Sequence, residues 1–426
     1  MQAVKRIYLN LYFFVMACYV FFNKGVAYSF MVEALWLLGI GLIFLSRRSY
    51  EFVWDLRTKL LSFFLFVGLL YIPLGLIGYP FIDVIRDSFV FQYGWFVFII
   101  FLFKEEQKLV WQKIIGIYSW FPVFGLLNFL FQNFVYNADR FTPFGGISFL
   151  LYKYGDMGVH LLISSLILLV FQQKRSIRFQ AVMALLILFN LLILTAYSRS
   201  GMLAYVLGLL IYILLSNEAY IKIRVKQYSK YLPLLLMIVL PIYASIKVQE
   251  NFQGRKVGIE QVTQNIGSFV GASKDANLED NKIWRLVWWA KILDYSFSPS
   301  YFLQGKGLGM SLSETDEVIS EEAEVRSPHN FHLTLMARFG VPIFCIWLFW
   351  LIILYKPMFK KQLDAKTLLI STVLLAFMVN ATFDVFLEGP MGAFPFWTWV
   401  GLLFLIQAFP NKDFKENESN AWNEVF

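Results

Sequence analysis

Residues 328–355 read PHNFHLTLMARFGVPIFCIWLFWLIILY, and this stretch decides the kind of fold that the chain adopts. From 330 to 355 the stretch is almost continuously apolar. A run of about 20 apolar residues crosses the hydrocarbon core of a bilayer as an α-helix. A membrane β-strand would instead alternate apolar and polar side chains over about ten residues. The stretch therefore predicts a transmembrane helix that begins directly after a polar junction.

Similar apolar runs recur along the whole chain of 426 residues, which is 58% hydrophobic and 15% charged. Soluble domains carry roughly 25% charged residues. Because lipid offers no partners for backbone polar groups, continuous runs of this length predict helices. We expect an all-α integral membrane protein with about twelve transmembrane helices. The predicted spans are 7–23, 27–46, 60–79, 84–103, 110–134, 157–172, 177–197, 201–216, 231–248, 330–355, 367–387 and 393–409.

Lysine and arginine are abundant on only one side of these spans, and this bias predicts their orientation. The short connections on the other side contain only Lys24, Arg86, Arg140, Lys153 and Arg199. Positive residues favour the cytoplasm, so both termini are predicted to be cytoplasmic. The basic side carries Lys5, Arg6, Arg47, Arg48, Arg57, Lys59, Lys104, Lys108, Lys174, Arg175, Arg178, Lys222, Arg224, Lys226, Lys230, Lys356, Lys360, Lys361, Lys366, Lys412 and Lys415.

This orientation divides the chain into four parts. Residues 1–248 hold predicted transmembrane helices 1–9, and residues 330–410 hold helices 10–12. Between them, residues 249–329 form one large extracytoplasmic loop, and residues 411–426 form a cytoplasmic tail. Within the loop, Trp284, Val287, Trp288, Ile292 and Tyr295 have a helical spacing. We expect an amphipathic helix there, which lies in the membrane interface or packs on the transmembrane bundle.

The net charge of +8 follows from the basic cytoplasmic loops, where it attracts anionic membrane lipids. No basic stripe resembles a nucleic-acid-binding surface, so no nucleic acid is expected as a partner. Cys18 and Cys345 both fall inside predicted spans, which leaves no disulfide framework and no thiolate metal site.

Two arginines near the outer membrane face are candidates for binding an anion. Arg199 lies between two apolar runs in Ser198-Arg199-Ser200-Gly201. It either snorkels to the interface or forms an anion site with the hydroxyls of Ser198 and Ser200 and the N–H groups of the next helix. Arg285 lies in the amphipathic segment, where it either packs against tryptophans or binds the anion. Arg140 and the Arg86-Asp87 pair are weaker candidates, since ordinary loop charges explain them.

His329 and His332 lie at the end of the outer loop, in a chain with only three histidines. His329 is the better candidate for a general base, because an ordinary histidine titrates near pH 6.5 and lies here at the membrane junction. His332 lies further into the apolar run and is expected to pack. Asp384 and Glu388 either orient the histidine or pair with arginines. Two histidines do not complete a zinc site, so no metal is expected.

Several of these residues occur in motifs whose order and topological side resemble the bacterial O-antigen ligase and O-antigen polymerase superfamily. The motifs are Thr195-Ala196-Tyr197-Ser198-Arg199-Ser200-Gly201 at a helix junction, Trp284-Arg285-Leu286 in the outer loop, Gly305-Lys306-Gly307-Leu308-Gly309, and His329-Asn330 before an apolar helix. About twelve spans with a large loop between nine and ten are also similar to that family. Residues from about 195 to 345 carry the sequence-specific likeness.

The resemblance implies a glycosyltransferase of surface polysaccharide biosynthesis in the bacterial inner membrane, with a GT-C-like architecture and a periplasmic active site. The donor would be a glycan on undecaprenyl diphosphate, and the acceptor a hydroxyl of lipid A–core or of another lipid-linked oligosaccharide. Arg199 and Arg285 would hold the diphosphate, and His329 would activate the acceptor hydroxyl, without a cofactor and with inversion at the anomeric carbon. Supporting candidates are Arg140, Ser198, Ser200, Asn330, His332, Asp384 and Glu388.

Two other classes of protein also have many apolar spans. A transporter or flippase for an anionic or lipid-linked substrate would contain arginines, but it usually has internal repeats and a binding site near the midplane of the membrane. No two halves of this chain resemble each other, and the candidate residues lie at one face. A structural scaffold would leave Arg199 and the His329 junction without a role. Whether the enzyme is a ligase or a polymerase stays open, because both reactions use the same kind of site.

Overall fold

The computed structural model describes residues 2–132, 148–172, 175–245, 258–269, 276–318, 326–360 and 363–410. Over these ranges the protein is all α-helical and contains no β-strand, which confirms the predicted fold class. The apolar helices are α1 (Gln2–Val26), α2 (Met31–Leu45), α3 (Leu56–Leu76), α4 (Phe81–Gln92), α5 (Phe96–Ile100), α6 (Gln107–Leu130), α8 (Met157–Val170), α9 (Ile177–Tyr197), α10 (Arg199–Leu215), α11 (Ala219–Ser245), α15 (Phe331–Tyr355), α16 (Ala365–Ala381) and α17 (Pro390–Ala408).

Seven helices in the described part of the chain are long and apolar enough to cross a membrane. Four shorter apolar helices add to them: Met31–Leu45, Tyr154–Val170, Arg199–Leu215 and Ala365–Ala381. The predicted span 84–103 and most of the span 110–134 lie in one helical segment, Phe81–Leu130, where short 3₁₀ turns replace a loop. Every predicted span therefore overlaps a helix, while the total of twelve crossings stays a prediction.

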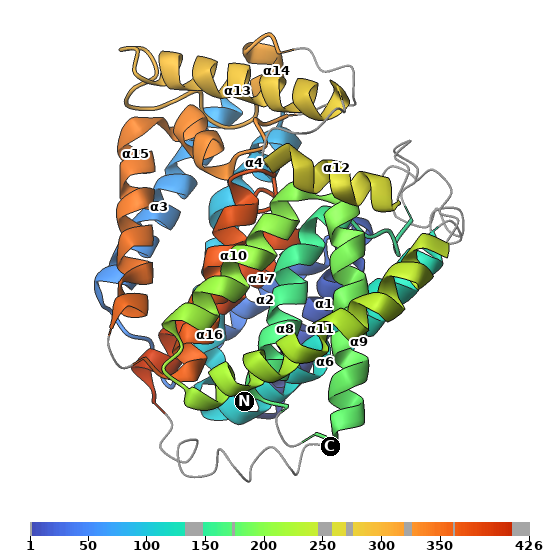
Figure 1. The fold of residues 1–426 in the computed structure, drawn as a ribbon. Helices are drawn as coiled ribbons and strands as arrows, with labels where there is room; N and C mark the ends of the chain where they lie inside the picture. The colour runs from blue at the N-terminus through green and yellow to red at the C-terminus, as the bar shows by residue number, and fades with distance from the viewer. Residues whose placement is uncertain are drawn as a thin grey trace.

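Residues 249–329, the predicted outer loop, contribute three helices at the end of the bundle opposite the N-terminus (Figure 1). They are α12 (Ile259–Phe269), α13 (Ala276–Ser296) and α14 (Leu312–Thr315). Below them, α8 is buried along its whole length, and α17 is buried from Gly392 to Leu405. Helices α8, α16 and α17 thus form the centre of the bundle, and their outer ends lie beneath the loop helices.

Helix α13 packs on α14 and α15 through its tryptophan face, as one of the two expected placements requires. Trp288 and Ile292 are fully buried against Leu312 of α14 and Ala337 of α15. Val287 does not share this face, because it is 62% exposed. The packing face is therefore narrower than the sequence spacing predicts.

Helix α15 is interrupted at Gly340, whose φ of 78° and ψ of 174° lie outside the helical region. The interruption frees backbone groups that lipid could not satisfy. The turn that contains Gly305 and Gly307 supplies partners: Lys306 N donates to Ala337 O at 2.8 Å, and Gly307 N donates to Arg338 O at 2.8 Å. The Gly305–Gly309 motif therefore covers the break in α15 and fixes the outer loop to it.

The orientation can be tested by labelling single cysteines, after Cys18 and Cys345 are replaced by alanine. Ser300 is exposed at the end that carries α13, and Ser49 is exposed in the connection between α2 and α3. We expect Ser300→Cys to react with a membrane-impermeant maleimide in intact spheroplasts, and Ser49→Cys to react only after lysis. Labelling in the reverse pattern would overturn the predicted orientation.

The glycine turn can be tested by comparing two alanine variants. A Cβ at Gly305 would lie 2.4 Å from Arg338 C, whereas a Cβ at Gly307 meets nothing within 4 Å. Both glycines have positive φ, so each alanine adds backbone strain of about 1–2 kcal/mol. Only Gly305→Ala adds a backbone clash, so it should lower the unfolding temperature of the purified protein clearly more than Gly307→Ala does. Equal changes would contradict the proposed packing of this turn on α15.

Candidate active site

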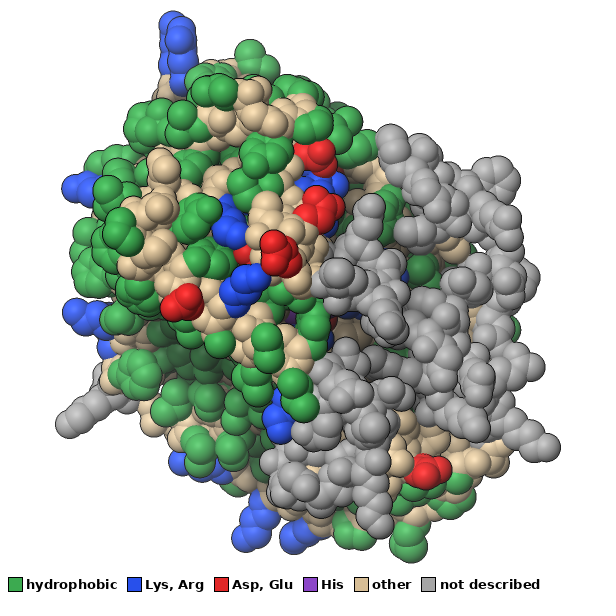
Figure 2. Space-filling model, turned by 90° about the horizontal axis from the view of Figure 1, so that it is seen from above, with side chains coloured by type: hydrophobic (Ala, Val, Ile, Leu, Met, Phe, Trp, Pro, Cys, Tyr) green, Lys and Arg blue, Asp and Glu red, His purple; other side chains and the backbone are tan. Residues whose placement is uncertain are grey.

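The candidate site lies at the end of the bundle that carries α13, beneath this helix. Figure 2 shows this end of the molecule, where basic and acidic side chains gather among hydrophobic ones. Four segments meet here: α13, the junction before α15, the turn at 382–389 between α16 and α17, and the stretch 153–156 before α8. The last three are helix ends or short connections, so they offer polar groups that a helix interior would not.

Two side chains of α13 hold two of these segments in place. Arg285 Nη1 donates to Phe383 O at 3.1 Å, and Trp289 Nε1 donates to Pro328 O at 2.8 Å. Residues four apart on a helix share a face, so one turn of α13 reaches both carbonyls. These carbonyls belong to the residues directly before Asp384 and His329. Helix α13 therefore places the candidate base and the candidate carboxylate together.

His329 itself has a left-handed backbone conformation, with a φ of 52°. Non-glycine residues adopt this region rarely, at a cost of about 1–3 kcal/mol, and such residues cluster at functional sites. The next residue, Asn330, caps α15: its Oδ1 accepts hydrogen bonds from His332 N at 3.1 Å and Leu333 N at 3.2 Å. The His-Asn motif thus combines a strained histidine with the cap that fixes the start of the following helix.

The surroundings of His329 favour its neutral form. Burial, opposed by the nearby carboxylate of Asp384 and aided by the positive charges of Arg285 and Lys153, lowers the pKa of His329 to about 4. The edge of the Trp284 ring also faces the imidazole, with 6.2 Å between ring centroids. At neutral pH the side chain is therefore an uncharged imidazole that can accept a proton.

Lys153 is a site residue that the sequence-based selection missed. Its Nζ lies 2.6 Å from Asp384 Oδ1 and 3.6 Å from Asp156 Oδ1. Burial opposes the charge on Asp384, but Lys153, together with His329 and Arg285, lowers the pKa of Asp384 below its ordinary value. Burial likewise opposes the charge on Lys153, yet the two aspartates raise the pKa of Lys153. The pair is therefore ionised at neutral pH.

The start of α10 reaches the same region through close packing. Ser198 caps α10, since Gly201 N donates to Ser198 Oγ at 3.0 Å, and Ser200 Oγ lies 3.1 Å from Ser198 Oγ. A Cβ at Gly155 would lie 3.6 Å from Asp384 Oδ2 and 3.7 Å from Ser198 Oγ. Ser198 and Asp384 thus flank the same point in space. Arg199, the first residue of α10, is half-buried directly beside it.

The remaining histidine and glutamate candidates have structural partners. His332 Nδ1 accepts a hydrogen bond from Trp347 Nε1 at 3.1 Å, which is the packing role expected for it. Glu388 Oε1 accepts one from Thr334 Oγ1 at 2.7 Å, and burial raises the pKa of Glu388. Of the two carboxylates, Asp384 is therefore the one that lies beside His329. Arg140 lies outside the described residues.

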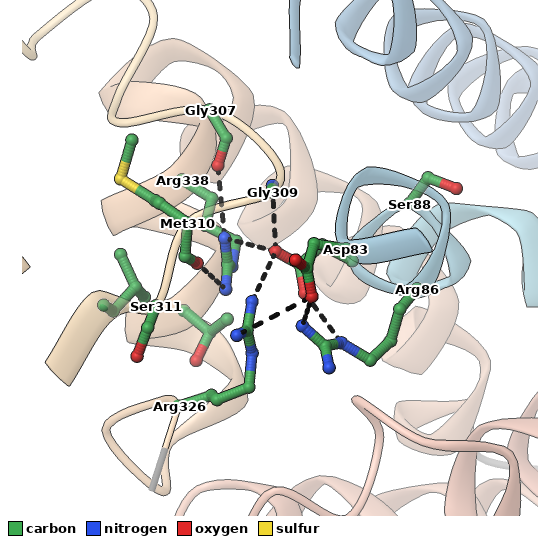
Figure 3. A network of polar contacts seen from close by, with 12 residues as sticks. Asp83, Arg86, Ser88, Gly307, Gly309, Met310, Ser311, Arg326 and Arg338 are labelled. Atoms are coloured by element: carbon green, nitrogen blue, oxygen red, sulfur yellow. Dashed lines mark hydrogen bonds and ion pairs between the residues drawn. The ribbon is translucent and has the colours of Figure 1, made fainter. Parts of the chain in front are cut away.

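Asp87 has a larger role than the local ion pair expected from the sequence. Figure 3 shows the network of polar contacts to which Arg86, Arg326, Arg338 and Gly309 belong. Asp87 Oδ2 accepts from Gly309 N at 3.0 Å and lies 3.0 Å from Arg338 Nη1 and 3.6 Å from Arg326 Nη2. Arg86 does pair locally, with Nε at 3.7 Å from Asp87 Oδ1. The network joins α4 to the glycine turn, to α15 and to the segment before His329, so it fixes the outer loop on the bundle.

No group of three or more His, Cys, Asp or Glu side chains that could hold a metal ion occurs in the ranges that the structure describes. The charged groups around His329 are instead Arg285, Lys153 and Asp384, with Asp156 beside Lys153. Guanidinium groups bind phosphate oxygens in pairs, and a neutral imidazole accepts a proton. The arrangement can thus bind a phosphorylated substrate and activate a hydroxyl group.

The comparison with known proteins agrees with this chemistry. No curated protein matches the chain. Residues 182–348 match the family model described as O-antigen ligase. The matched part contains Arg199, Arg285 and His329, whereas Lys153 and Asp384 lie outside it. The match supports the resemblance of this membrane protein to the O-antigen ligase and O-antigen polymerase superfamily that the sequence motifs indicate.

Proposed function

We propose that the protein is an inner-membrane glycosyltransferase of surface polysaccharide biosynthesis, acting on the periplasmic side. It transfers a glycan from undecaprenyl diphosphate to a hydroxyl of lipid A–core or of another lipid-linked repeat unit. One observation carries the proposal: a single turn of α13 contributes Arg285, and the same turn fixes His329 beside it. A cation for the leaving group and a base for the acceptor are thereby held on one rigid element.

The proposed reaction uses His329 as the general base. The acceptor oxygen attacks the anomeric carbon while its proton passes to the imidazole, and the bond from that carbon to the diphosphate oxygen breaks. Such proton transfer typically contributes about 10²–10⁴-fold to the rate. A base and a leaving group on opposite faces of the sugar produce inversion. The imidazole is suited to this step because its lowered pKa keeps it neutral at physiological pH.

Arg199 and Arg285 are proposed to neutralise the diphosphate as it leaves. A planar guanidinium can bridge two phosphate oxygens, which a lysine cannot do. Charge stabilisation of this kind, by donors already in place, is often the largest contribution to catalysis. Two guanidiniums at one site can thus take the part that a divalent metal plays in other phosphate-releasing reactions, and we propose a metal-independent mechanism.

The function can be tested with purified protein in liposomes, mixed with lipid-linked glycan and a hydroxyl acceptor. A glycosyltransferase makes a new glycosidic bond without any gradient, and a flippase only moves the donor between leaflets. Product formation that persists in the presence of a chelator supports the proposal. Donor movement without bond formation would identify a transporter, and activity that is abolished by chelation and restored by a divalent metal would overturn the metal-independent mechanism.

The arginine roles predict a clear loss of transfer in two variants. Arg199→Lys keeps the charge but loses the planar fork, and Arg285→Ala loses both the charge and the bond to Phe383 O. We expect each to insert normally into the membrane and to lose at least about tenfold in turnover, since a charge-assisted hydrogen bond contributes about 1.5–3 kcal/mol. Arg48→Lys, exposed between α2 and α3, is the control and should keep full activity. Unchanged turnover in both site variants would remove the proposed diphosphate ligands.

The proposed role of His329 as general base predicts how substitution and pH change the turnover. His329→Ala should lose about 10²–10⁴-fold in turnover, as general-base catalysis typically contributes, while it still binds the donor. His332→Gln keeps an acceptor for Trp347 Nε1 and should be much milder. Because the pKa of His329 is lowered to about 4, the neutral base persists as the pH falls from 7. Activity should therefore decline only as the pH approaches 4, and a decline centred between 6 and 7 would show that His329 titrates like an ordinary histidine.

A further inference from the structure

We propose that Lys153 and Asp384 form a positioning pair for His329, in which Lys153 holds the Asp384 carboxylate against the base. The inference rests on the proposed function, because it assigns the pair a role in proton transfer to His329. Both residues lie outside the matched residues 182–348. The pair is thus a contribution of the rest of the chain to the site.

Asp384 is fixed from two directions. Its backbone follows Phe383, whose carbonyl accepts from Arg285 at 3.1 Å, so α13 sets the position of the turn. Its Oδ1 accepts from its neighbour Val385 N at 2.7 Å and from Lys153 Nζ at 2.6 Å. The carboxylate therefore has a defined orientation, which a positioning role requires.

Lys153 is held at both of its ends, unlike a surface lysine. Asn23 of α1 is fully buried and binds its backbone twice: Lys153 N donates to Asn23 Oδ1 at 2.7 Å, and Asn23 Nδ2 donates to Lys153 O at 3.2 Å. At the other end, the ammonium lies between Asp384 and the fully buried Asp156. The lysine is thereby held in one position between the two carboxylates.

The charged groups that face His329 have opposite effects on its protonation. Asp384 attracts the protonated imidazole, whereas Arg285 and Lys153 repel it. Lys24 and Asp156 face Lys153 in turn. Before the reaction, burial, aided by the two cations, keeps the base neutral. When the acceptor proton arrives on the imidazole, the nearby Asp384 carboxylate stabilises the imidazolium without taking the proton itself, and the proton later leaves to water.

The test measures the titration of His329 directly, by deuterium exchange at the imidazole C2 position, followed by mass spectrometry over a pH series. This readout does not depend on turnover. Lys153→Met should raise the titration midpoint, and Asp384→Asn should lower it, each by up to about 1 pH unit. Lys153→Arg keeps the cation and should leave the midpoint near the wild-type value. Lys104→Met removes an ion-paired lysine beside Glu51, far from the site in sequence, and serves as the control without a shift.

The acid side of the pH–activity profile should shift in each variant in the same direction as the titration midpoint of His329: upward for Lys153→Met and downward for Asp384→Asn. Shifts of both variants in one direction, or no shift in either, would overturn the positioning role, even if both variants lose activity. If Lys153→Met does not accumulate in membranes, Lys153→Gln replaces it. Asp384→Asn still tests the direction in which the titration midpoint of His329 shifts. If the two variants show opposite midpoint shifts but the wild-type protein forms no glycosidic bond, the proposed function is refuted while the positioning pair remains supported.

Discussion

A peptide group inside a bilayer finds no partner in lipid, and this constraint determines where the protein can place polar chemistry. The interruption of α15 at Gly340 exists only because the Gly305–Gly309 turn covers its exposed backbone groups. The outer loop and α15 therefore form one packed unit. The same constraint leads the candidate site to helix ends, where Ser198 caps α10 and Asn330 caps α15.

The buried charges at this end of the bundle lie beside charges of opposite sign. Lys153 lies between two aspartates, and Asp87 lies among three arginines and a backbone N–H. Isolated charges at these positions would be costly, because burial removes their hydration. The Asp87 network and the Lys153–Asp384 pair differ in the groups that they contact. The Asp87 network joins backbone segments of the loop to α4, whereas the Lys153–Asp384 pair acts on the imidazole of His329.

The sequence allowed the helices to be predicted because each apolar run has few ways to avoid water. It was less informative where one helix follows another directly, as in Phe81–Leu130, because a turn of 3₁₀ helix leaves no break in hydropathy. Arg285 and His329 could be selected from residue type and position alone. Lys153 could not, since its partner Asp384 is 231 residues away, and the only signal was a lysine on the side where lysines are rare. Asp87 was taken for a local pair because its partner Gly309 is 222 residues away.

The bonds from α13 to Phe383 and Pro328 also have a consequence for biogenesis. During synthesis α13 emerges well before Phe383, which follows α16. The hydrogen bond from α13 to Pro328 can form early. The bond to Phe383, which positions Asp384, can form only after the C-terminal helices have inserted. A nascent chain that stops after α15 thus contains Arg285 and His329 but not Asp384. The candidate site is complete only when the last helices have been made.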